Sequence, residues 1–359
     1  MSDHQGKVDP HVRLAWLDYA KAIGIFLVVF GHASRSIERT QGLTWSEHLQ
    51  ALDGIIYAFH MPLFFLLAGY AASLQRAQAS ALFWKALFWG VAVPYLVWSA
   101  VWIGLKILMP DAANFPLDVS ALGNILWQPV EHFWFLYHLF FIRAGWYLAG
   151  HVPGKGGVIQ AALILLSAAA AAILLTAYPD LDWVAGFLRN FAIYGIGLVL
   201  LPPLLAHWSN GPSMRLVLLG VVLWMWGLVM GGAAANIWPA VGGSLAVAGL
   251  AMALPQPSGP VSRTFAYLGE ASLAIYVMHL LAAAAMRIGL AKFGLLSEPV
   301  LLIAATVAGL LLPAFAYWCV LSMAQWKAPA LPRFLGLGMA SRSAYLTLWP
   351  GLKQPVTTN

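Results

Sequence analysis

Charged residues are scarce in this chain of 359 residues, and cysteine is almost absent. Asp, Glu, Lys and Arg make up 9% of the residues, hydrophobic residues make up 61%, and the mean hydropathy is +0.79. An ordinary soluble domain, in which about 25% of residues are charged, is therefore excluded. The single cysteine, Cys319, excludes an internal disulfide framework and a Cys-x-x-Cys metal site. The composition indicates a polytopic membrane protein, and we expect no metal cofactor.

Long apolar windows recur along most of the chain. A helix needs about 20 apolar residues to cross the hydrocarbon core of a bilayer. The sequence contains ten such windows, near residues 14–34, 53–74, 83–108, 132–150, 158–178, 183–206, 215–232, 238–254, 264–288 and 299–325. The expected fold is an all-α, polytopic transmembrane helix bundle of about ten spans. Residues 1–325 are expected to form one membrane domain, and residues 326–359 a short cytoplasmic tail.

The net charge of +6 is explained better by membrane topology than by nucleic-acid binding. If the N-terminus is cytoplasmic, twelve Lys and Arg residues lie at the inner ends and loops of the predicted spans. Only four then lie outside, namely Arg35, Arg39, Arg287 and Lys292. Because cytoplasmic loops are enriched in Lys and Arg, this bias predicts that both termini are cytoplasmic. We expect the lipid bilayer as a partner and no nucleic acid.

The first apolar window, "LDYAKAIGIFLVVFGHA" at residues 17–33, contains three ionisable side chains. Lys21 and His32 are eleven positions apart, which in a helix places them within roughly 20° of one face and about 16 Å apart. Asp18 lies roughly 40° from that face on the other side. Ionisable residues inside a membrane are candidates for function. The Asp18–Lys21 pair has a second interpretation, because it could serve only to fix helix packing.

Four segments of the sequence together carry a family resemblance. "RLAWLDYAKAIGIFLVVFGHA" (13–33), "FHMPLFFLLAGY" (59–70), "HFWFLYHLFFI" (132–142) and "LGEASLAIYVMHLL" (268–281) resemble, in this order, the signatures of the acyltransferase-3 family of membrane acyltransferases. The resemblance is strongest to its fucose-4-O-acetylase-like branch. Many members of that family have arginine where this chain has Lys21, so the positive charge is kept but the bidentate guanidinium is lost.

The resemblance implies a membrane O-acyltransferase, specifically an O-acetyltransferase, in the bacterial inner membrane. Its donor substrate would be acetyl-CoA or another acyl-CoA, and its acceptor a sugar or surface glycan, as in polysaccharide modification of the cell envelope. Lys21 and Lys85 would bind the donor phosphates, although Lys85 also suits ordinary anchoring at the inner end of its span. His32 would be the general base. Asp18 and His279 complete the predicted catalytic set.

Six further residues are predicted to bind substrate: His60, Trp134, Arg189, Glu270, Ser272 and Tyr276. Ser272, Tyr276 and His279 have i, i+4, i+7 spacing and form one polar seam on a helix. Interhelical packing would also explain the first two.

Simpler interpretations stay open for other members of this set. His60 could be structural, and Trp134 suits the aromatic belt at a membrane interface. His138 is interpreted as an interhelical hydrogen-bonding residue, and Cys319 as a small core residue.

Two other kinds of protein remain as alternatives. A bundle with intramembrane Asp, Lys and His also suits a proton-coupled secondary transporter. A structural component of a glycan-export complex would have little use for the Lys21–His32 face. A requirement for acetyl-CoA distinguishes the enzyme from both.

Overall fold

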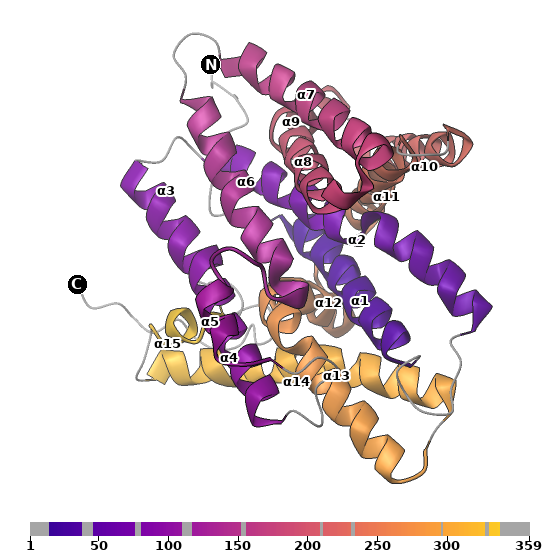
Figure 1. Cartoon of the computed structure of the whole chain (residues 1–359). Helices are drawn as coiled ribbons and strands as arrows, with labels where there is room; N and C mark the ends of the chain where they lie inside the picture. Colours follow the sequence, from indigo (N-terminus) through magenta and orange to yellow (C-terminus); the bar gives the residue numbers. More distant parts are fainter. Residues whose placement is uncertain are drawn as a thin grey trace.

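The computed structural model describes residues 14–37, 46–75, 80–109, 117–151, 156–208, 211–230, 234–295, 297–326 and 330–337. Within these ranges all regular structure is helical (Figure 1). The helical segments are α1 (Ala15–Ile37), α2 (Glu47–Leu74), α3 (Ser80–Leu87), η1 (Phe88–Ala92), α4 (Val93–Leu108), α5 (Ser120–Asn124), η3 (Glu131–Phe133), α6 (Trp134–Gly150), α7 (Gly156–Ala177), η4 (Pro179–Leu181), α8 (Asp182–Gly195), η5 (Ile196–Leu200), α9 (Leu201–His207), α10 (Pro212–Met230), α11 (Ala234–Ala253), α12 (Pro260–Glu270), α13 (Ser272–Lys292), α14 (Glu298–Trp326) and α15 (Leu331–Phe334).

Eight helical stretches in the described ranges are long and apolar enough to cross a membrane. They are Ala15–Ile37, Glu47–Leu74, Ser80–Leu108, Gly157–Ala177, Pro179–His207, Pro212–Met230, Ser272–Lys292 and Glu298–Ala324. The two other predicted windows, 132–150 and 238–254, overlap the helices α6 and α11. The predicted all-α, polytopic fold is confirmed.

The predicted window at 264–288 is divided in the structure. Helix α12 ends at Glu270 and α13 begins at Ser272, with Ala271 between them at ψ 0°. The two helices follow different partners, because α12 packs along α1 whereas α13 packs along α14. The predicted window runs across the break because apolar residues lie on both sides of Ala271, at 265–268 and from Leu273 onward.

Helix α1 lies at the centre of the bundle, in contact with α2, α11, α12, α13 and α14 (Figure 1). Its backbone lies so close to α12 that a Cβ atom on Gly269 would overlap the carbonyl group of Asp18. Similarly, a Cβ atom on Gly69 in α2 would overlap the Tyr194 carbonyl in α8. Small residues permit such backbone contacts between membrane helices. These contacts fix the positions of α1 and α2, which carry much of the site described below.

Helices α7 and α10 lie at the periphery and expose most of their apolar side chains. Only 17% of the apolar window of each is buried inside the protein. Their exposed hydrophobic residues include Leu165, Leu166, Val222, Leu228 and Val229. Such a surface suits contact with lipid tails, as expected for a protein in a bilayer.

Part of the predicted tail is in contact with the bundle. Of residues 326–359, the structure describes Trp326 and residues 330–337. Here α15 packs against α4 and α14, with Pro332 and Leu337 buried. The Trp98 Nε1 atom donates a hydrogen bond of 3.1 Å to the Leu335 carbonyl. This segment is therefore joined to α4.

Candidate active site

Three histidine rings from distant parts of the sequence meet at one end of α1. The ring centroids of His32 (α1) and His279 (α13) are 5.1 Å apart. His132, in η3, lies 5.6 Å from His279 and 6.4 Å from His32. His132 and His279 are buried, whereas His32 is partly exposed. The structure thus brings the predicted residues His32 and His279 together and adds His132; these three residues are called the histidine cluster below.

His279 has a defined tautomer. Its Nδ1 atom lies 2.7 Å from the Tyr276 carbonyl oxygen and 3.2 Å from that of Ile275. Because a carbonyl oxygen only accepts hydrogen bonds, Nδ1 must carry the proton, and in the neutral ring Nε2 keeps its lone pair. Nε2 is buried and has no hydrogen-bond partner among the described residues. His279 therefore offers a proton-accepting nitrogen beside the other two rings.

His132 is held in place by its neighbours. The Tyr276 hydroxyl donates a hydrogen bond to the His132 carbonyl oxygen. Glu131 forms an ion pair with Lys106 and accepts a 3.1 Å hydrogen bond from the Trp102 Nε1 atom. Glu131 also has a φ of 40°, a left-handed conformation that is uncommon for residues other than glycine. Its side-chain contacts hold this turn, which places His132 against the cluster.

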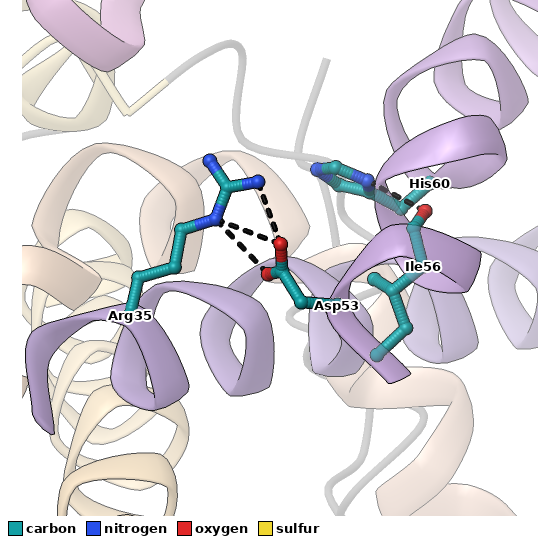
Figure 2. A network of polar contacts seen from close by, with 4 residues as sticks. All are labelled: Arg35, Asp53, Ile56 and His60. Carbon is teal, nitrogen blue, oxygen red and sulfur yellow. Dashed lines mark hydrogen bonds and ion pairs between the residues drawn. The ribbon is translucent and has the colours of Figure 1, made fainter. Parts of the chain in front are cut away.

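A second polar network joins α1 to α2 beside the cluster (Figure 2). The Arg35 guanidinium donates to both carboxylate oxygens of the buried Asp53, with Nη2–Oδ2 at 2.7 Å and Nε–Oδ1 at 3.0 Å. It also lies 3.2 Å from the centroid of the Tyr57 ring. In the sequence, Arg35 is only one of the charges that bear on topology. Its proximity to Asp53 could have been anticipated, because Arg35 directly follows the first predicted span (14–34) and Asp53 begins the second (53–74).

His60 lies within the same part of α2. Its Nδ1 atom is 2.9 Å from the Ile56 carbonyl oxygen, so Nδ1 again carries the proton (Figure 2). Its ring centroid is 4.5 Å from that of Tyr57, which in turn is 6.4 Å from that of His32. His60 is therefore connected to the histidine cluster through Tyr57 rather than by direct contact between the rings.

A cavity of about 260 Å³ lies between α1, α2, η1, α6 and α13. Its polar lining residues are Lys21, Gln75, Arg143, Ser272 and Tyr276, and the rest of the lining is apolar. Tyr276 is also the residue that donates to the His132 carbonyl, so the cavity, called the central cavity below, ends beside the histidine cluster. Arg143 was interpreted from the sequence only as an inner-end charge. The structure therefore supplies a guanidinium that sequence reasoning missed.

Asp18 lies away from the histidine cluster. Asp18 is buried, and its Oδ1 atom lies 3.6 Å from the Lys21 Nζ atom. It precedes His32 by fourteen residues, which is about 21 Å along a helix. That separation excludes Asp18 from the histidine cluster. Its carboxylate instead lies beside the ammonium group of Lys21, which lines the central cavity.

Two other predicted residues do not reach the cavity. Lys85 is exposed on α3 and is absent from the cavity lining. Glu270 ends α12, with its carboxylate oxygens buried, and is absent from the cavity lining. Both residues were predicted because they are charged residues within or beside an apolar window. A charge in such a window does not show whether its side chain faces the cavity.

Trp134 lies apart from the cavity, beside His138 on α6, with 5.2 Å between the two ring centroids. Arg189 is on α8, and its Nε atom is buried without a hydrogen-bond partner among the described residues. Neither ring nitrogen of the buried His138 has a hydrogen-bond partner among the described residues. The interpretation of His138 as an interhelical hydrogen-bonding residue was therefore wrong.

In the described ranges, no group of three or more His, Cys, Asp or Glu side chains is arranged to hold a metal ion.

Comparison with known proteins identifies the family of the chain. Residues 14–318 match the family model for an acyltransferase domain, acyltransferase-3. One similar protein is the nodulation protein NolL of Mesorhizobium japonicum, with 26% identity over 216 residues, which are 57% of this chain and 52% of that protein. The chain thus spans about half the length of this relative, and no solved structure matches it. Because the family model covers most of the chain, the protein belongs to the acyltransferase-3 family of integral-membrane acyltransferases.

Proposed function

We propose that the protein is an O-acetyltransferase that moves an acetyl group from acetyl-CoA to a hydroxyl group of a saccharide. The main support is the central cavity, which has Lys21 and Arg143 in its lining and meets the histidine cluster at Tyr276. Cations suit the phosphates of a CoA thioester, and histidine suits proton removal from a hydroxyl group. Membership of an acyltransferase family favours this function over the secondary transporter.

The size of the cavity indicates which part of the donor it holds. Its volume of about 260 Å³ is below the roughly 300–1,000 Å³ of pockets that enclose a whole drug-sized ligand. It therefore suits the acetyl group and part of the pantetheine arm, with the nucleotide at the Lys21 end. The planar guanidinium of Arg143 can bind a phosphate through two parallel hydrogen bonds, which Lys21 cannot do.

His32 is the proposed general base, because it is the partly exposed member of the histidine cluster. It takes the proton of the acceptor hydroxyl as the oxygen attacks the thioester carbonyl carbon. The carbon–sulfur bond then breaks, the acetyl group stays on the acceptor oxygen, and the CoA sulfur takes up the proton. His279, with its ring centroid 5.1 Å away, is proposed to orient His32 by accepting a hydrogen bond on Nε2; that bond is absent among the described residues and would form when the substrates bind.

The donor site predicts a loss of affinity for acetyl-CoA. Lys21→Met and Arg143→Met should each raise the Kd of radiolabelled acetyl-CoA about tenfold or more in lipid nanodiscs. A hydrogen bond to a charged group contributes about 1.5–3 kcal/mol, and about 1.4 kcal/mol corresponds to a factor of ten. Arg215→Met, which removes an exposed cation at the start of α10, is the matched control and should leave the Kd unchanged.

Lys21 could instead have a purely structural role, in which its charge only neutralises the buried Asp18. The double change Asp18→Asn with Lys21→Met removes both charges and so separates the two roles. A Kd that stays high in the double variant supports phosphate binding, whereas recovery of wild-type affinity assigns Lys21 to neutralising Asp18. Failure of the wild-type protein to bind acetyl-CoA would contradict the proposed function itself.

We further propose that both termini are cytoplasmic, so that the donor enters from inside and a surface glycan approaches from outside a bacterial inner membrane. Two contacts identify the loops at the opposite ends of α1. The Tyr19 hydroxyl donates to the Pro255 carbonyl at the Lys21 end, and His132 joins the loop before α6 to the His32 end. The exposed residues Gln256 and Gln128 thus mark the two sides.

Cysteine labelling tests this orientation. In a Cys319→Ala background, an impermeant thiol reagent added to spheroplasts should label Gln128→Cys and not Gln256→Cys. Both positions should react once the membrane is opened, which controls for accessibility. The reverse pattern would place the donor cavity on the outer side and reject the directional scheme.

A further inference from the structure

His132 belongs to the histidine cluster but has no part in the acyl transfer described above. It is 7% exposed, and neither of its ring nitrogens has a hydrogen-bond partner among the described residues. Buried polar groups are normally hydrogen-bonded, so a ring in this state is best explained by a partner that arrives with the substrates. A neutral imidazole carries one N–H donor and one acceptor nitrogen. His132 therefore brings an unused donor into the cluster, whichever of its nitrogens carries the proton.

The His132 ring lies among the groups that react. Its centroid is 6.4 Å from that of His32, 5.6 Å from that of His279 and 5.9 Å from that of Tyr276. Tyr276 lines the central cavity, and His32 is the proposed base. A thioester that comes from the cavity and an acceptor hydroxyl at His32 therefore meet beside the His132 ring.

The backbone that carries His132 is held in an uncommon conformation. The preceding residue, Glu131, has a φ of 40°. Its carboxylate is paired with the buried Lys106 and accepts a hydrogen bond from the Trp102 Nε1 atom, while the Tyr276 hydroxyl donates to the His132 carbonyl. Backbone strain persists only where the surrounding contacts impose it, and it is concentrated at functional sites. These contacts fix the place of the His132 ring in the cluster.

The start of a long helix lies next to this ring. Helix α6 begins at Trp134, two residues after His132, and so has its amino-terminal end at the cluster. The amino-terminal end of a helix carries a partial positive charge of about half a unit, which favours negative charge nearby. The N–H of His132 and the helix end thus favour the same partner, an oxygen atom on which negative charge accumulates. In acyl transfer that atom is the carbonyl oxygen of the thioester.

We propose that His132 donates a hydrogen bond to the carbonyl oxygen of the acetyl thioester and stabilises the oxyanion that forms there. The inference rests on the proposed function and adds a further catalytic residue to it. When the acceptor oxygen adds to the carbonyl carbon, the π electron pair moves onto the carbonyl oxygen, and His32 takes the hydroxyl proton. The electron pair returns as the carbon–sulfur bond breaks. His132 keeps its own proton throughout, so it acts as a neutral donor.

The carbonyl stretching band of bound acetyl-CoA tests this contact without turnover. Infrared difference spectra between acetyl-CoA and acetyl-CoA isotope-labelled at the thioester carbonyl carbon isolate the band, with the full-length protein in nanodiscs and no acceptor present. Because a hydrogen bond weakens the carbonyl double bond, the band should lie at a lower frequency in the wild type than in His132→Phe, which keeps a flat ring without a donor. Equal frequencies would overturn the proposal. Failure of the wild type to bind acetyl-CoA would instead contradict the proposed function.

The rate of acetyl transfer gives the size of the effect. His132→Phe should lower transfer to surface glycans about 100-fold, the lower end of the range for one oxyanion donor, with a much smaller change in the Kd of acetyl-CoA. His151→Phe is the matched control, because His151 is an exposed histidine at the opposite end of α6, and it should behave as the wild type. Wild-type transfer in His132→Phe would reject the catalytic role.

Amide side chains identify the donor nitrogen. Asparagine brings its amide nitrogen to the region of Nδ1, and glutamine brings it to the region of Nε2. One of His132→Asn and His132→Gln should therefore recover the low band and most of the transfer rate, with an unchanged pH dependence. Defects in both as severe as that of His132→Phe would reject a neutral donor. If the phenylalanine variant does not fold, a lower band in one amide variant than in the other supports the proposal, and equal bands decide against it.

Discussion

Replacement of His32 by alanine should reduce acetyl transfer to about one hundredth of the wild-type rate or less. General base catalysis contributes roughly 10²–10⁴-fold, and His32 is the proposed base of the histidine cluster. Transfer is measured by mass spectrometry of surface glycans from cells that lack the gene and carry either the wild-type or the variant copy. Folding should persist, because a residue near the membrane interface adds little to the energy of insertion.

The matched control for this variant is His48→Ala. His48 is an exposed histidine in the first turn of α2, outside the histidine cluster. It should retain wild-type transfer at equal expression. Retention by His32→Ala of more than about a tenth of the wild-type rate would exclude a general base at this position. Loss of transfer in both variants would point to a general effect on the membrane domain.

The helical fold and one face of the site follow directly from the sequence. Apolar windows predict the membrane helices, because in lipid the backbone can only be satisfied within a helix. The eleven-residue spacing of Lys21 and His32 predicts one shared face, and the structure places Lys21 at the central cavity and His32 in the cluster. Helical periodicity fixes which residues of one helix share a face, so this kind of prediction needs no knowledge of the other helices.

Contacts between segments could not be derived in the same way. His32 and His279 are 247 positions apart, so their ring contact depends on how α13 packs beside α1. Arg143 could not be recognised from the sequence as part of the cavity, since it resembles a charge that only sets the topology. The position of Asp18 beside Lys21, with 3.6 Å between Oδ1 and Nζ, does follow from the sequence, because the two residues are three positions apart on one helix.

Substitution of His279 is expected to have the second large effect on acetyl transfer. Because the tautomer of His279 is fixed, different substitutions can test its Nδ1 and Nε2 atoms separately. His279→Ala should lower acetyl transfer about 100-fold, the lower end of the range for acid–base groups. His279→Asn keeps a donor for the Tyr276 carbonyl but has nothing at the Nε2 position. It should therefore be as defective as the alanine variant. His151→Ala is the matched control, because His151 Nδ1 bonds its own helix in the same way, 2.7 Å from the Tyr147 carbonyl oxygen, but is exposed.

The glutamine variant distinguishes positioning from proton transfer. Glutamine extends an amide to the region of Nε2, where its oxygen accepts a hydrogen bond but does not take up a proton. If His279 positions His32 by accepting a hydrogen bond, His279→Gln should recover transfer to within about tenfold of the wild type, with an unchanged Kd for acetyl-CoA, while His279→Asn should not. Equal and severe defects in the Gln and Asn variants would instead show that the His279 Nε2 atom takes up the proton itself. His32 would then be the group that orients the base.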